Sequence, residues 1–121
     1  MSRNRMYPFM SISGKGWRIR IGVDTIRILG MPLYISLYKT KDFSSIAVGE
    51  CEAKNVMSFR VPESLLSGEK SDFYIHSMAF IQDLFLNNDL DADKTYRIMG
   101  HWIEEKKIVA FDIEDAVALV S

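Results

Sequence analysis

Two segments of alternating apolar and polar side chains, separated by one helical turn, constrain the fold of this chain most. Residues 17–21 and 33–38 show the period of two that is typical of strands buried on one face. Between them, residues 24–29 place apolar side chains three positions apart, and the Gly-Met-Pro that follows ends such a helix. Residues 46–51 return as a third strand after a polar turn. Residues 15–51 therefore predict a strand, a helical turn and a hairpin.

A weaker copy of this arrangement follows over residues 56–114. Residues 57–61 alternate, and Pro-Glu-Ser-Leu-Leu then opens a short helix. Further strands are predicted at 96–99 and 108–111, facing each other across a polar turn as a hairpin. An insert at 69–94 carries apolar side chains at helical spacing, which predicts one amphipathic helix. Internal duplication and the chance recurrence of a common unit both account for the pattern.

Length and composition bound the class of protein. A chain of 121 residues makes one domain, and 48% hydrophobic with 26% charged residues is ordinary for a folded soluble protein. The longest apolar runs have four or five residues, whereas a membrane span needs about 20. The single cysteine, Cys51, cannot form an internal disulfide, which indicates a reducing, cytoplasmic setting.

We therefore expect a strand-rich single domain of the α+β class over residues 17–121. A flexible basic arm is expected over residues 1–16, where Pro8 and a Ser-Gly-Lys-Gly run discourage regular structure. The first strand-helix-hairpin unit takes up residues 17–52. The C-terminal residues 114–120 fit a short helix or a strand equally well.

The charge of the chain is divided between two halves of opposite sign. Residues 1–42 carry eight Lys and Arg against two Asp, a net charge of +6, and residues 43–121 carry a net charge of −7. Such asymmetry indicates a charged partner. Arginines that alternate along a strand point from one face, where they can neutralise phosphates and release counterions. A solvated outer strand face accounts for the same arginines without a partner.

The run WRIRIGVDTIRILGMPLYISLYKTKDFSSIAVGEC resembles the AbrB/SpoVT swapped-hairpin family of bacterial transition-state regulators and antitoxins. The shared elements are a basic alternating strand, a short helix that ends in Leu-Gly, and a following hairpin. Gly22 stands where that family typically has a proline. The resemblance implies that two copies interlock into a barrel whose basic face binds double-stranded DNA. The positions that match this face are Lys15, Arg18, Arg20, Arg27, Lys39 and Lys41.

The residues that carry catalysis or bind metals in other proteins lack the necessary spacing here. His76 and His101 form no zinc motif, and the acidic neighbours of Cys51 raise its pKa. The aspartates at 89, 91 and 93 alternate as in a calcium loop, but Lys94 and Gly100 occupy the positions that require Gly and Glu. We expect no enzyme, no cofactor and no bound metal.

The acidic half supports an alternative function of a different class. A surface that mimics nucleic-acid phosphates would dock on a basic protein, as phage or mobile-element inhibitors of CRISPR effector nucleases do. The residues proposed for this surface are Asp89, Asp91, Asp93, Glu104 and Glu105. Solubility accounts for the same charges. A homodimer through exposed hairpin edges is a further expectation, unless a duplicated core satisfies these edges within one chain.

Overall fold

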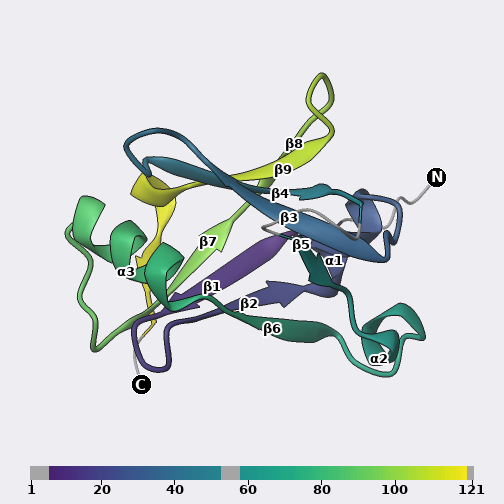
Figure 1. Cartoon of the computed structure of the whole chain (residues 1–121), viewed down its shortest axis with the longest axis horizontal. Coiled ribbons are helices and arrows are strands. Elements are labelled where there is room, and N and C mark those ends of the chain that lie inside the picture. The colour runs from purple at the N-terminus through teal and green to yellow at the C-terminus, as the bar shows by residue number, and fades with distance from the viewer. Residues whose placement is uncertain (1–5, 53–57, 120–121) are drawn as a thin grey trace.

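The computed structural model describes residues 6–52 and 58–119, which form two antiparallel five-stranded sheets (Figure 1). Sheet A has the strand order β10-β7-β1-β2-β6, and sheet B has the order β5-β3-β4-β9-β8. Sheet A contains β1 (Phe9–Ser13), β2 (Arg18–Gly22), β6 (Asp72–His76), β7 (Thr95–Met99) and β10 (Val117–Ala118). Sheet B contains β3 (Tyr34–Lys39), β4 (Ser45–Glu50), β5 (Ser58–Arg60), β8 (His101–Ile103) and β9 (Ile108–Asp112).

Short helices lie at the two ends of the stacked sheets. The longest described helix, α3 (Met78–Asn87), lies at one end, and α1 (Val23–Ile28) and α2 (Glu63–Leu66) lie at the other (Figure 1). A short 3-10 helix, η1 (Ile113–Asp115), follows β9. The amphipathic helix predicted in the insert is confirmed, and the α+β class is confirmed with it. The C-terminal stretch combines both alternatives, because η1 is followed by β10.

The inner faces of both sheets and one face of each helix form a single apolar core. Burial of each such aliphatic side chain contributes about 1.5–3 kcal/mol, and this burial holds the two sheets together. Fully buried members are Met10, Ile12, Ile19, Ile21 and Ile98 in sheet A, Ile35, Val48 and Val109 in sheet B, and Ile26, Leu65 and Ile81 in the helices.

The first predicted strand-helix-hairpin unit forms as expected, but the second copy predicted over residues 56–114 does not. Strand β2, helix α1 and the β3–β4 hairpin follow one another as the alternation predicts. The hairpin predicted between 96–99 and 108–111 is wrong, because β7 pairs with β1 in sheet A whereas β9 pairs with β4 and β8 in sheet B. The chain changes sheets at Gly100, where a Cβ would lie 2.6 Å from the Phe111 ring. An internal duplication of the whole unit is therefore not confirmed.

Two smaller segments do interlock. The segments β2-α1-β3 and β5-α2-β6 each pass from one sheet to the other, in opposite directions. The first strand of each pairs with the last strand of the other, as β2 with β6 and β3 with β5. Strand β6 lies inside the insert at 69–94, where the sequence predicted only a helix.

The flexible arm expected over residues 1–16 is wrong for the part that the structure describes. Phe9–Ser13 forms β1, the central strand of sheet A, and pairs with β2 and β7. Met10 and Ile12 are fully buried, which explains why this segment is held in the sheet. The glycines after β1 form a hairpin turn, since Gly16 has a φ of +78°. Residues 1–5 lie outside the described part of the chain.

Candidate nucleic-acid interface

The outer face of sheet A brings together arginines from two strands. Alternate residues of each strand point away from the core, so cross-strand rows of outward side chains form. One row runs across four strands as Tyr74, Arg20, Ser11 and Arg97, since Arg20 pairs with Tyr74 and Ser11, and Ser11 pairs with Arg97. Arg18 lies in the next row, opposite Ser13. Arg18, Arg20 and Arg97 therefore share one face.

Two aromatic rings hold these arginines in place. The guanidinium of Arg97 lies 4.1 Å from the centre of the Phe9 ring, and that of Arg20 lies 5.2 Å from the same centre. The guanidinium of Arg18 lies 4.7 Å from the centre of the Tyr74 ring. Such cation–π contacts contribute about 0.5–1 kcal/mol each at exposed sites. They orient the guanidinium groups and leave their N–H groups able to donate hydrogen bonds.

The face keeps a net positive charge. Arg20 forms an ion pair with Asp72 at 3.5 Å, and both side chains remain one-third exposed. Among the described residues no ion pair of Arg18 or Arg97 with a carboxylate is found. Lys15 lies in the turn that joins Ser13 to Arg18 and is exposed. Four cations and the Asp72 carboxylate thus lie on or beside this surface.

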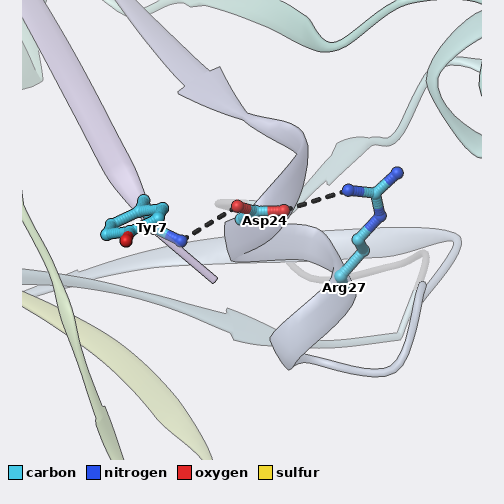
Figure 2. A network of polar contacts seen from close by, with 3 residues as sticks. All are labelled: Tyr7, Asp24 and Arg27. Carbon is cyan, nitrogen blue, oxygen red and sulfur yellow. Dashed lines mark hydrogen bonds and ion pairs between the residues drawn. The ribbon is translucent and has the colours of Figure 1, made fainter. Parts of the chain in front are cut away.

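Arg27 does not belong to this face. It lies on α1, where its guanidinium donates to Asp24 Oδ1 at 3.0 Å (Figure 2). The second oxygen of Asp24 accepts the backbone N–H of Tyr7 at 2.9 Å, so this carboxylate joins the start of the described chain to α1. Asp24 makes no side-chain cap, and Gly22 occupies the cap position of the helix.

Lys39 and Lys41 lie at the β3–β4 turn of sheet B, at the end of the molecule that carries α3 (Figure 1). The Lys39 ammonium lies 4.3 Å from the centre of the Phe43 ring. The six basic residues predicted from the sequence therefore divide into three places. Lys15, Arg18 and Arg20 come together, Arg27 is on α1, and the two hairpin lysines are in the other sheet.

Arg97 is a site residue that the sequence analysis missed. The sequence did indicate an outward-facing arginine here, because Tyr96, Arg97 and Ile98 alternate as a strand with the arginine on the outer face. Its position next to Arg18 and Arg20 depends on the pairing of β7 with β1, which local alternation does not predict. Phe9 and Ser11 were missed because residues 1–16 were expected to form a flexible arm, whereas Phe9–Ser13 forms β1.

The acidic residues proposed for the alternative function lie in two separate loops. The aspartates at 89, 91 and 93 belong to the connection between α3 and β7, and the glutamates at 104 and 105 to the β8–β9 turn (Figure 1). Glu104 accepts a hydrogen bond from Lys107 at 2.6 Å, and this contact lowers the pKa of the Glu104 carboxyl. Their role as a docking surface stays a prediction.

The residues with potential for catalysis or metal binding remain apart. Within residues 6–52 and 58–119, no group of three or more His, Cys, Asp or Glu side chains is placed to hold a metal ion. Burial raises the pKa of the Cys51 thiol, and the charges of Glu50 and Glu52 raise it further. This confirms the direction predicted from the acidic neighbours.

A hollow of about 850 Å³ lies on the outer face of sheet B. Its lining includes the small residues Ala47, Gly49 and Ala110, and also three lysines, at 39, 106 and 107. Lys107 there is already paired with Glu104. The hollow shares no residue with the arginine face of sheet A.

Comparison with known proteins identifies no relative of this chain. No family model matches the chain, and neither a curated protein nor a solved structure matches it. No helix in the described part of the chain is both long enough and apolar enough to cross a membrane.

Proposed function

We propose that this protein is a small, non-enzymatic DNA-binding regulatory protein that contacts the phosphate backbone through the outer face of sheet A. The observation that carries the proposal is the gathering of Arg18, Arg20 and Arg97 over Phe9 and Tyr74. Arginine is the residue that best matches phosphate geometry, because its planar group donates two parallel hydrogen bonds. Lys15 extends the positive surface beyond the end of β2.

The resemblance to the AbrB/SpoVT family supports the same proposal. In that family two strand-helix units interlock and present a basic strand to DNA. Here β2-α1-β3 and β5-α2-β6 interlock through the β2–β6 and β3–β5 pairs, and β2 carries Arg18 and Arg20. We propose that the chain is a single-chain variant of this arrangement, extended by β1 and by the segment from α3 to β10.

A mobility-shift assay with a mixed-sequence duplex at two salt concentrations tests the proposal. Combined Arg18→Glu and Arg97→Glu substitutions are expected to weaken binding at low salt by at least about tenfold, because each removes a phosphate contact and adds a repulsive charge. Arg27→Glu, also an exposed reversal, is the matched control and should bind nearly as the native protein does. Absence of a shift by the native protein at low salt would refute DNA binding.

A further inference from the structure

We infer that a depression beside Ser11 on the outer face of sheet A is a binding subsite for a single phosphate group. The inference rests on the proposed function, since it assigns the ligand group that the same face recognises. The depression has a volume of about 150 Å³ and is lined by Ser11, Ser13, Arg18, Arg20, Tyr74, Thr95 and Leu119. A water molecule takes up about 30 Å³ in the liquid, so the depression has room for one tetrahedral oxyanion.

The Ser11 hydroxyl is the observation that points to a ligand. Ser11 is 6% exposed, and its Oγ has no hydrogen-bond partner among the described residues. A buried hydroxyl without a partner costs free energy, and nearly all such groups in folded proteins are paired. Ser11 lies between Arg20 on β2 and Arg97 on β7, in register with both. A phosphate oxygen bound in the depression would accept the missing hydrogen bond beside Arg18 and Arg20, the two arginines of the lining.

The neighbouring hydroxyls show that this lack of a partner is particular to Ser11. Ser13 Oγ donates to the carbonyl oxygen of Lys15 at 3.3 Å, and Thr95 Oγ1 donates to Ser13 Oγ at 3.2 Å. The second unpaired polar atom of the depression is Arg20 Nε, which is also buried. The two unpaired groups on the lining are thus an O–H and an N–H.

The lining selects an anion. Besides the apolar Leu119 it contains hydroxyls and two arginines, and no carboxylate is among its residues. Asp72 pairs with Arg20 through a terminal nitrogen, so Nε stays able to donate to a ligand. A phosphodiester of a nucleic-acid backbone and a free phosphate present the same oxygens to these donors. Two probes, a phosphate diester and inorganic phosphate, therefore distinguish a nucleic-acid backbone from a free phosphate as the ligand.

Inorganic phosphate and dimethyl phosphate are titrated separately into the 121-residue chain, and backbone amide shifts are followed by NMR. Saturable shifts centred on Ser11, Arg18 and Arg20 are expected. Dimethyl phosphate, the diester probe, should bind at least as tightly as inorganic phosphate if the subsite serves a backbone. Ser11→Ala should weaken binding about tenfold. The control is Thr25→Val, which removes another buried unpaired hydroxyl, on α1. It should bind as the native protein does.

A second variant covers the case in which Ser11→Ala fails to fold. Arg18→Gln changes an exposed side chain of the lining and should weaken phosphate binding several-fold with the native spectrum otherwise kept. Equal phosphate binding by the native protein, Ser11→Ala and Arg18→Gln would overturn the subsite, even if duplex DNA still shifts in the mobility assay. Phosphate binding that depends on Ser11 without any duplex binding would keep the subsite for a free phosphate ligand and overturn the proposed function.

Discussion

The ring of Phe9 lies in the space that a side chain at residue 22 would need. A Cβ at Gly22 would be 2.4 Å from Cε1 of Phe9, well inside van der Waals contact. Gly22 has an ordinary extended backbone, with φ −77° and ψ 154°, so its conformation does not require glycine. Glycine is required here because the Phe9 ring approaches so closely. Glycine at this position lets the Phe9 ring approach β2 closely, where the guanidinium groups of Arg20 and Arg97 both lie near it.

Gly22→Ala is therefore expected to destabilise the fold by about 1–3 kcal/mol, the usual cost of forcing atoms into a filled space. Urea unfolding followed by tryptophan fluorescence measures the change. The control is the same substitution in a Phe9→Ala background, where the methyl group has room. If Gly22→Ala costs as much there as in the native protein, the Phe9 contact is not the reason for the glycine.

The salt dependence of DNA binding should separate the arginines of sheet A from Arg27. Each phosphate contact contributes roughly 0.9 to the slope of log K against log salt concentration. Arg18→Gln and Arg97→Gln should each lower the magnitude of this slope by about that amount. Arg27→Gln should leave it unchanged, because its guanidinium is engaged by Asp24 on α1. Fluorescence anisotropy of a labelled duplex at several salt concentrations gives the slopes, and equal slopes for all three variants would contradict the assignment.

Local pattern predicted the elements of residues 17–51 well. The alternation around Ile19 and the Leu-Gly-Met-Pro ending of α1 are short-range signals, and both lie where the sequence placed them. Asp72–His76 also alternates, with Phe73 and Ile75 inward, but it lies next to a strong helical pattern and was not predicted as a strand. The segment before Lys15 was misjudged because its glycines suit a flexible arm and a hairpin turn equally.

The candidate site could be predicted only in part, because strand pairing is not local. Arg18 and Arg20 follow from the alternation of β2 alone. Arg97 joins them only because β1 lies between β2 and β7, and that strand was expected to be unstructured. Lys39 resembles the other basic residues in sequence, yet it belongs to sheet B. Which arginines share a face is thus decided by the sheet order, which single-strand patterns do not contain.

Asp24→Ala should release the first described residues from α1. Asp24 accepts both the Tyr7 backbone N–H and the Arg27 guanidinium, as Figure 2 shows. Losing a hydrogen bond to a partly exposed charged acceptor is expected to cost about 1 kcal/mol. Amide hydrogen exchange at Tyr7 should become faster. Arg27→Ala is the control, since it removes the ion pair and keeps the Tyr7 bond. Unchanged exchange at Tyr7 in Asp24→Ala would show that this bond does not hold the segment.

Stability should depend on pH through Asp42 in the β3–β4 turn. The Ser44 hydroxyl, the Ser44 backbone N–H and the Thr40 hydroxyl donate to this carboxylate and hold its pKa below the ordinary 3.8. A group whose pKa is depressed by folding stabilises the native state above its unfolded pKa and loses that contribution as the pH falls through the folded value. The turn should therefore be weakened by acid below about pH 4. NMR titration of the Asp42 carboxyl carbon measures this directly. Ser44→Ala should move the pKa back towards 3.8, and an unchanged pKa in that variant would exclude the Ser44 hydroxyl as the main cause.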